Sequence, residues 1–428
     1  MTEFTRRKVL IGGAAIAGAS ALPFGFARPA FSQAKPKLVV IGGGPGGATL
    51  AKYVARDSNG AIDVTLVEPK ESFTTCFHSN LYLGDVRSWE SINHSYDEIA
   101  SKYGITHART TASGIDRNAR TVTLADGGTL DYDHLVVAPG ISLKYDSVEG
   151  YSEEVAEKLP HAWLAGPQTQ LLKAQLDALE DGAQIVMIAP PNPYRCPPGP
   201  YERVSMMAHV LKNKGHTNSR IIILDTKESF SKQGLFSEGW QRHYPGMVEW
   251  QDPSMHGGIG GVDAATMTVE TDLADYEADL INVIPAQMAG AIARDAGLAN
   301  ETGYCPIEAE TMRSTMDENV TVLGDATIAG DMPKSAFSAN SQAKVAANAI
   351  RASLTDSRQF PARYTNTCWS LIDTDDAVKV GGRYEPKEGK ITAVETFVSQ
   401  TGEDAETRRR TQEENMGWYA GIVADIFT

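Results

Sequence analysis

The sequence predicts an α/β fold with two Rossmann-like nucleotide-binding domains and a C-terminal α+β domain. The first observation is residues 38–68, in which an apolar run, a glycine-rich turn, a helical run and a second apolar run follow one another. The second is residues 181–225, which repeat this order of elements without a glycine-rich turn. Short apolar strands that alternate with helices are typical of parallel sheets.

The first turn has the spacing G-x-G-x-x-G at Gly42, Gly44 and Gly47. The missing side chains allow a tight turn, the approach of a pyrophosphate and close packing of helix on strand. The helix N-terminus favours the negative charge of a pyrophosphate. Glu68 ends the next strand, where its carboxylate can accept a hydrogen bond from a ribose hydroxyl. A plain glycine-rich loop is the alternative, but a dinucleotide site is favoured by the flanking strand, helix and strand expected at residues 38–41, 48–56 and 64–67.

Two further strand ends indicate which dinucleotide binds. Residues 131–140, DYDHLVVAPG, end in a small-residue turn, and residues 320–326, VTVLGDA, place Asp325 at a strand tip. This combination resembles the FAD-binding disulfide reductase-like flavoproteins, which have the glutathione reductase fold. The resemblance implies that Asp325 bonds the ribityl chain of FAD. Just beyond it, Lys334 is a candidate to reach the flavin pyrimidine edge, whereas Ser335 can simply cap the next helix.

Residues 181–225 are typical of a dinucleotide fold that has lost its ligand. A strand at residues 184–188, a helix at 204–211 and a strand at 221–224 are expected, but the turn between the first two, APPNPYRCPPGPYER, is rich in proline. Prolines and bulky side chains fill the place where a pyrophosphate needs bare backbone. We therefore expect no NAD(P)H. The loop presents Cys196 instead, with Glu202 six residues later at the helix start.

The chain begins with an export signal, expected at residues 1–34. Arg6-Arg7 forms a twin-arginine pattern, a mild apolar run follows at residues 9–26, and a small-residue cleavage site follows at 32–34. An N-terminal anchor is the alternative, but the run is interrupted and shorter than the ~20 residues of a membrane span. No other stretch approaches a span. Twin-arginine export carries folded proteins, so we expect a periplasmic protein that acquires its flavin before export.

Composition excludes several classes of partner. With 428 residues, of which 42% are hydrophobic, the chain can bury two or three domain cores. A formal charge of −15 argues against nucleic acid and anionic membranes as partners. The histidines show no metal-ligand spacing, so no metal is expected. The polar stretch at residues 403–415, with three consecutive arginines, is typical of a solvated helical face.

The chain has four cysteines, Cys76, Cys196, Cys305 and Cys368. None forms a C-x-x-C pair, so zinc, thioredoxin-like and c-type haem motifs are absent from the sequence. In an oxidising compartment, one or two structural disulfides are an ordinary interpretation, with three connectivities open if all four residues pair. The position of Cys196, on the loop that faces the flavin in this fold, argues for a redox role instead.

Four segments together resemble the flavoprotein subunit of flavocytochrome c sulfide dehydrogenase. They are SFTTCFHSNLYLGD at residues 72–85, YRCPPGPYER at 194–203, PKSAFSANSQAKVAANAI at 333–350 and NTCWS at 366–370. The resemblance implies that Cys76 bonds covalently to the flavin 8α-methyl group. It also implies that Cys196 and Cys368 form a redox disulfide beside the flavin, and that Glu202 handles protons. Cys305 has no role in the resemblance and is expected to be a buried thiol.

This arrangement suits the oxidation of sulfide. Hydrosulfide can attack one sulfur of a disulfide, which forms a persulfide and releases the other sulfur as a thiolate. A flavin accepts two electrons and passes them on singly. Glu202 can move protons if burial raises its pKa. The sequence does not decide which cysteine sulfide attacks.

Three functions therefore compete. The first is a periplasmic sulfide dehydrogenase that forms a heterodimer with a c-type cytochrome subunit and passes electrons to it. The second is a peripheral-membrane sulfide:quinone oxidoreductase, for which only residues 418–427 suggest an apolar surface. The third is a non-catalytic electron-transfer flavoprotein with a structural disulfide. In all three we expect an FAD domain at residues 35–150 and 285–350, a degenerate NAD-like domain at 151–284, and a C-terminal domain for flavin and partner contacts at 351–428.

Overall fold

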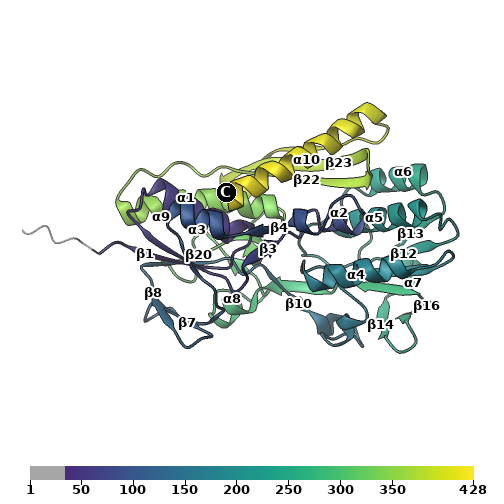
Figure 1. The fold of residues 1–428 in the computed structure, drawn as a ribbon, viewed down its shortest axis with the longest axis horizontal. Helices are drawn as coiled ribbons and strands as arrows, with labels where there is room; N and C mark the ends of the chain where they lie inside the picture. The colour runs from purple at the N-terminus through teal and green to yellow at the C-terminus, as the bar shows by residue number, and fades with distance from the viewer. Residues whose placement is uncertain (1–33) are drawn as a thin grey trace, which may run out of the picture. The chain divides into compact units, whose positions relative to one another are not determined.

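The computed structural model describes residues 34–428 (Figure 1). The twin-arginine motif and apolar run expected in residues 1–34 lie outside the described residues, so export stays a prediction. Within residues 34–428, no helix is both long enough and apolar enough to cross a membrane.

The first sheet contains five parallel strands in the order β20-β9-β1-β2-β5. Their bounds are Val320–Val322, His134–Val137, Lys37–Ile41, Asp63–Val67 and Thr106–Ala108. Helices α1 (Pro45–Asp57) and α9 (Ala336–Thr355) pack together over one face of this sheet (Figure 1). Apart from the edge strand β5, the strands are mostly aliphatic and buried, as expected for a parallel sheet covered by helices.

The strand register brings the predicted cofactor residues to one edge of this sheet. Ile41 pairs with both Val67 and Val137, and Val137 pairs in turn with Val322. The residues that follow these strand ends, namely the glycine turn, Glu68, the turn at 138–140 and the turn with Asp325, therefore emerge side by side. Ligands of open parallel sheets bind at this carboxyl edge.

The second sheet is also parallel, in the order β13-β12-β11-β17. Its strands are Val248–Gln251, Arg220–Leu224, Gln184–Ile188 and Leu280–Val283, and its helices are α4 (Pro167–Ala178), α5 (Gly199–Asn213) and α6 (Gln233–His243). The antiparallel pair β10 (Ile141–Lys144) and β18 (Ala286–Ala289) joins this region to the first. The α/β fold with two Rossmann-like sheets is thus confirmed, while the domain boundaries stay predictions.

The C-terminal region is α+β, as predicted. Strands β22 (Tyr364–Asp373), β23 (Asp376–Lys387) and β24 (Lys390–Val398) form an antiparallel sheet, and α10 (Ala405–Phe427) lies across it (Figure 1). The prediction of a solvated polar face was wrong for Arg408, which is 1% exposed. Its guanidinium lies 3.3 Å from Asp376 and 3.6 Å from Glu238, because α10 packs on β23 and brings these residues together.

Shorter elements complete the structure. The strands are β3 (Ser72–Thr74), β4 (Asn93–Ser95), β6 (Ala112–Asp116), β7 (Thr121–Leu124), β8 (Thr129–Asp131), β14 (Ile259–Asp263), β15 (Thr268–Thr271), β16 (Asp275–Glu277), β19 (Cys305–Pro306) and β21 (Thr327–Ile328). The helices are α2 (Ser79–Leu83), α3 (Asp97–Tyr103), α7 (Pro253–His256) and α8 (Ala291–Asp295).

Candidate functional site

The glycine turn between β1 and α1 has no room for side chains at two of its positions. A Cβ at Gly42, where φ is +97°, would lie 2.3 Å from the carbonyl oxygen of Ala138, and one at Gly47 would lie 1.9 Å from the carbonyl oxygen of Gly42. At Gly44, the N-cap of α1, the nearest atom to a Cβ would be 3.6 Å away on the Phe73 ring. The turn is therefore tight where it packs and open at the helix N-terminus, as a pyrophosphate site requires.

Glu68 lies beside this turn. One carboxylate oxygen accepts a hydrogen bond from the Gly43 amide at 2.9 Å, and the other accepts one from the Lys70 amide at 3.1 Å. A cavity runs past the glycine turn and Glu68 to the turn at residues 138–140 and to Asp325. The four features that the sequence assigned to a dinucleotide thus line one cavity.

Asp325 carries a buried oxygen, Oδ1, without a hydrogen-bond partner in the structure. The other carboxylate oxygen lies 4.0 Å from the Arg195 guanidinium. Burial raises the pKa of Asp325, and Arg195 opposes this change. Because a buried polar atom is almost always paired, Oδ1 calls for a donor such as a ribityl hydroxyl. The residues present therefore fit FAD.

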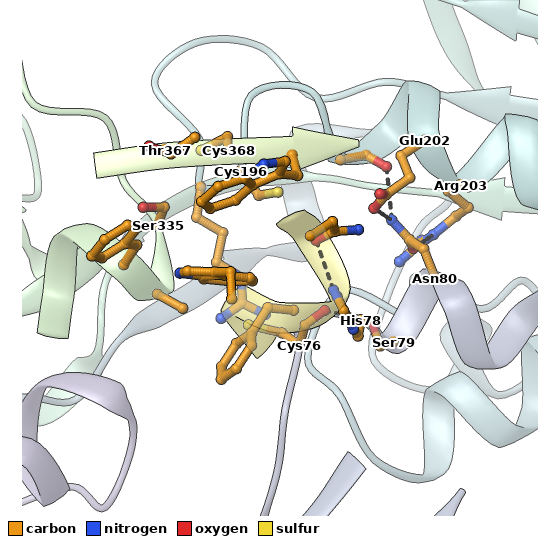
Figure 2. A pocket seen from close by; sticks show the side chains of 18 of the residues that line it. Cys76, His78, Ser79, Asn80, Cys196, Glu202, Arg203, Ser335, Thr367 and Cys368 are labelled. Carbon is orange, nitrogen blue, oxygen red and sulfur yellow. Dashed lines mark hydrogen bonds between the residues drawn. The ribbon is translucent and has the colours of Figure 1, made fainter. Parts of the chain in front are cut away.

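A second cavity adjoins the first, because Cys76, Arg195, Asp325 and Ala336 line both. It gathers the residues that the sequence assigned to sulfur chemistry, Cys196, Cys368 and Glu202. Figure 2 shows Cys196 and Cys368 near each other on one side of this pocket and Cys76 on the opposite side. The cofactor cavity thus leads directly to the cysteines.

Cys196 and Cys368 come from different elements. Cys196 lies on the loop before α5 with a left-handed backbone (φ 55°), and its amide donates to the carbonyl oxygen of Lys334 at 2.8 Å. Burial raises the pKa of the Cys196 thiol well above its usual value, and the neighbouring Cys368 raises it further. Cys368 lies in β22, where burial also raises its pKa and a hydrogen bond with Asn366 opposes this change. Both are free thiols in this structure, so their disulfide stays a prediction.

Glu202 lies in the first turn of α5 and is 8% exposed. Its carboxylate accepts hydrogen bonds from Asn80 Nδ2 and from the Leu371 amide, each at 2.9 Å. Burial raises the pKa of Glu202, and these two bonds oppose the change. Asn80, which sequence reasoning missed, is held in turn by the buried Arg203 at 3.2 Å. The only signal for Asn80 was its place in the segment that contains Cys76.

Helix α10 contributes Trp418 and Asn415 to the lining of the pocket. Trp418 lies 5.2 Å from Trp369 between ring centroids, and both line the cavity. His78 stacks on Tyr419 at 4.2 Å. Its Nδ1 accepts a hydrogen bond from Arg87, and its Nε2 lies 2.9 Å from Asn415 Oδ1 (dashed in Figure 2), so Nε2 carries the proton. Burial lowers the pKa of His78 to about 3, so this imidazole is neutral.

Two predicted or considered residues lie outside the cavities. The ammonium of Lys334 donates to the carbonyl oxygens of Asp325 at 3.0 Å and Thr327 at 2.6 Å, and is not among the groups lining either cavity. Its role toward the flavin stays a prediction, whereas Ser335 caps α9 as considered. Cys305 is buried in β19, where burial raises its pKa to about 11. In the part of the chain described, no group of three or more His, Cys, Asp or Glu side chains is placed to hold a metal ion.

Comparison with known proteins agrees with this geometry. Three family models match: "Pyridine nucleotide-disulphide oxidoreductase" at residues 36–165, "Sulfide dehydrogenase (flavocytochrome c) flavoprotein chain, central" at 169–285, and "Flavocytochrome c sulphide dehydrogenase, flavin-binding" at 360–427. The last two cover the loop with Cys196 and the strand with Cys368.

Individual relatives include a protein of the same name and sulfide:quinone oxidoreductases. The chain is 57% identical over 44 residues to the sulfide dehydrogenase (flavocytochrome c) flavoprotein chain of Chlorobaculum thiosulfatiphilum, which covers 10% of this chain and 90% of that sequence. It is 22% identical over 323 residues to the mitochondrial sulfide:quinone oxidoreductase of Dictyostelium discoideum, which covers 72% of this chain and 69% of the relative. The sulfide:quinone oxidoreductase structure from Aquifex aeolicus has the same fold, with a TM-score of 0.72, 17% identity and 91% of each chain covered. The chain therefore belongs to the flavocytochrome c sulfide dehydrogenase flavoprotein family of sulfide-oxidising flavoproteins.

Proposed function

We propose that this chain is the flavoprotein subunit of a periplasmic sulfide dehydrogenase, which oxidises sulfide at Cys196 and Cys368 and passes the electrons through FAD to a c-type cytochrome subunit. The observation that carries the proposal is the shared pocket. Cys196 and the buried acid Glu202 meet Cys368, which is far from them in the sequence, where the cofactor cavity ends.

The cysteine pair acts as an electrophile in its disulfide form. Hydrosulfide forms a bond to one sulfur, the S–S bond breaks, and its electron pair remains on the departing cysteine as a thiolate. Bound FAD supplies the acceptor that takes electrons in pairs and releases them singly. The aromatic side chains around the pocket limit access of water.

Glu202 is the proton-handling group of this proposal. Its raised pKa keeps the carboxyl protonated at a higher pH than an exposed glutamate, so it can serve as a proton donor and, once ionised, as an acceptor. Asn80 and the Leu371 amide fix its orientation.

Cys76 is the proposed covalent attachment point of the flavin. It lies in the loop between β3 and α2 and lines both cavities. The Ser79 hydroxyl donates to its carbonyl oxygen at 2.7 Å, which orders this loop. A thiol at the junction of the two cavities is placed to hold the ring between the ribityl site and the cysteine pair.

The electron acceptor separates the two main candidates. A cytochrome c partner is supported by the family models and by the relative from Chlorobaculum thiosulfatiphilum, whose names contain flavocytochrome c. A quinone acceptor is supported by the names of other relatives, such as the one from Dictyostelium discoideum. In α10, the side chains of Tyr419, Ile422, Ile426 and Phe427, which were considered as an apolar surface, are buried. This burial favours the cytochrome proposal.

The experiment is isolation of the protein from its native cells, followed by an acceptor assay. We expect the chain in the periplasmic fraction together with a haem-bearing polypeptide, and sulfide-dependent reduction of that cytochrome. Rapid reduction of a short-chain quinone, with no haem protein in the preparation, would instead select the sulfide:quinone oxidoreductase function. A matched preparation with Arg6 and Arg7 both changed to Lys tests the export route, and we expect it to leave the chain in the cytoplasm.

A further inference from the structure

Lys232 lies behind the cysteine pocket, at the residue before α6. Its side chain reaches between β22 and β23, and its ammonium donates to the carbonyl oxygen of Cys368 at 3.2 Å and to the hydroxyl of Ser370 at 2.9 Å. A third acceptor, the carbonyl oxygen of Val378, is 3.4 Å away. The Phe236 ring covers the ammonium at 5.7 Å from the ring centroid. Lys232 thus touches the backbone of a pocket cysteine without lining the pocket.

All hydrogen-bond partners of this ammonium are neutral. Among residues 34–428, no carboxylate lies within 4.0 Å of it, whereas Lys227 in the same region contacts Asp225 at 2.6 Å. An ammonium removed from water without a counter-ion is costly. Burial accordingly lowers the pKa of Lys232 to about 8. The site would gain stability from a new negative charge nearby.

The titratable groups around Lys232 belong to four elements. Cys368 of β22, Glu202 of α5 and Cys196 of the loop before α5 favour its charged form, and Arg408 of α10 opposes it. Three of these four groups are therefore the proposed reactive groups.

The other cations at the pocket are already engaged. Arg203 is buried and donates to four neutral acceptors, which are the carbonyl oxygens of His161 and Ala162 and the side-chain oxygens of Asn282 and Asn80. Arg195 points toward Asp325 and donates to the carbonyl oxygen of Trp163. Lys232 contacts Cys368 itself, at the carbonyl oxygen of this residue.

The backbone of Lys232 is held in an unfavourable conformation. Its φ of 66° lies in the left-handed region, as do those of the pocket residues His78 and Cys196. Non-glycine residues adopt this conformation at a cost and do so mostly where surrounding contacts enforce it. The contacts around Lys232 therefore hold its backbone in a strained conformation that places the side chain beside Cys368.

We propose that Lys232 is a positioning residue of the cysteine pocket, whose ammonium stabilises the thiolate that forms when the disulfide between Cys196 and Cys368 opens. This inference rests on the proposed function. Hydrosulfide brings one negative charge into the pocket, and after attack that charge resides on the released sulfur. The electron pair of the broken S–S bond stays on this sulfur, and the proton of hydrosulfide stays on the persulfide or passes to Glu202. The ammonium of Lys232 compensates the added charge.

The test measures thiolate formation directly, without sulfide. Flavin-loaded protein is reduced with dithiothreitol, freed of the reductant, and alkylated with iodoacetamide from pH 6 to pH 10. Peptide mass spectrometry then gives separate rates for Cys196 and Cys368. We expect K232M to slow alkylation of Cys368 about tenfold at pH 8, since tenfold corresponds to one pKa unit or about 1.36 kcal/mol. K232R, which keeps the charge, is expected to restore most of the rate.

Lys212 offers a matched control. It is 45% exposed and contacts Asp373, the last residue of the same strand, so K212M removes one lysine charge without touching the pocket. We expect K212M to leave both alkylation profiles unchanged. If K232M and wild type show the same alkylation profiles, the inference is wrong. Should K232M fail to fold, the same comparison is made between K232R and K232Q, and equal profiles there overturn it as well.

Failure of the proposed function gives a different pattern. If wild-type protein does not oxidise sulfide although K232M shifts the alkylation profile, the sulfide function is wrong and the charge-compensation role stands. If wild-type protein oxidises sulfide normally and alkylation does not depend on Lys232, only the inference about Lys232 is wrong.

Discussion

The molecule contains two strand–turn–helix–strand units of the same topology, and only the first has a glycine-rich turn. In the unit formed by β1, α1 and β2, the turn is bare backbone, and the cavity beside it extends to Glu68. In the unit formed by β11, α5 and β12, the corresponding turn carries prolines and aromatic side chains. Tyr194 is buried there and donates to the carbonyl oxygen of Pro197 at 2.7 Å.

The acidic residues at the ends of the second strands differ in the same way. Glu68 borders the cavity and bonds only backbone amides. Asp225 is completely buried, and its carboxylate accepts hydrogen bonds from Tyr201 at 2.6 Å, Trp250 at 2.9 Å and Lys227 at 2.6 Å. In the second unit, side chains of the protein already donate hydrogen bonds to the carboxylate that a ribose hydroxyl would need as its acceptor.

This difference shows how one fold unit serves two purposes. The start of a helix after a parallel strand is a fixed position at the carboxyl edge of a sheet. The first unit leaves this position open for an anion. The second unit fills it and so presents Cys196 and Glu202 toward the cavity of the first. The filled turn of the second unit thus accounts for the placement of the thiol and the acid.

The largest effect is expected at the cavity of the first unit, where a covalent bond between Cys76 and the flavin is proposed. After acid precipitation, the wild-type polypeptide should keep its yellow flavin, and Cys76→Ser should release all of it as free FAD. In this proposal the thiol at the junction of the cavities is the attachment point, so serine would leave only non-covalent contacts. Cys305→Ser is the control, because Cys305 is buried outside both cavities. Flavin that stays on precipitated Cys76→Ser, or leaves precipitated wild type, would contradict the linkage.

An intermediate effect on the rate of flavin reduction is expected from Glu202→Gln in the second unit. We expect sulfide-dependent flavin reduction to slow by roughly 10- to 100-fold and to lose part of its pH dependence, because the amide cannot exchange a proton. Stopped-flow absorbance across pH 6–9 measures this. An unchanged pH profile would remove Glu202 from proton handling.

The same variant tests the pKa of Glu202 through stability. Burial raises the pKa of Glu202 above its value in the unfolded chain, so the folded protein holds this proton to higher pH. The contribution of this proton to the free energy of unfolding is complete below the pKa of the unfolded state and is lost as pH rises through the pKa of the folded state. Urea unfolding should therefore show a smaller loss of stability with rising pH in Glu202→Gln than in wild type. Equal slopes would mean that the carboxyl is not perturbed.

No effect at all is expected when nicotinamide cofactors are offered to the second unit. NADH and NADPH should neither bind nor reduce the flavin, because the second unit offers no bare backbone for a pyrophosphate and no free acid for a ribose. Rapid mixing of oxidised protein with NADH is the measurement, with dithionite as the positive control. Fast bleaching of the flavin at micromolar NADH would show that the second unit still binds a nucleotide.

Local sequence was sufficient for the units themselves. The glycine spacing predicted β1, the turn and α1, and the apolar runs predicted β11 and β12 to within one residue. These features depend on neighbours in the chain, such as the absence of Cβ atoms or the period of apolar residues. The prediction that Cys196 and Cys368 form a disulfide beside FAD came from the family resemblance. Their spacing in the sequence could not supply it, because no local rule connects the two residues.

Residues that act through tertiary contacts were missed. Arg408 belongs to a run of three arginines that is typical of a surface, yet the packing of α10 on β23 buries it beside Asp376. Asn80 and Lys232 have ordinary surroundings in sequence, and their importance comes from partners on α5 and β22. Lys334 follows the expected motif, but the structure places its ammonium on backbone carbonyls beside Tyr304 instead of in the cavity.

The central claim is that Cys196 and Cys368 form a redox disulfide that passes electrons from sulfide to the flavin. The most direct test is flavin reduction by sulfide in folded, flavin-loaded Cys196→Ser and Cys368→Ser, followed by stopped-flow absorbance. A structural disulfide that closes so long a loop contributes about 4–5 kcal/mol, so flavin content and thermal unfolding are measured on the same samples. We predict that sulfide fails to bleach the flavin in either variant, while dithionite, which needs no thiol, bleaches it in both. Reduction by sulfide at the wild-type rate in flavin-loaded Cys196→Ser would contradict the account.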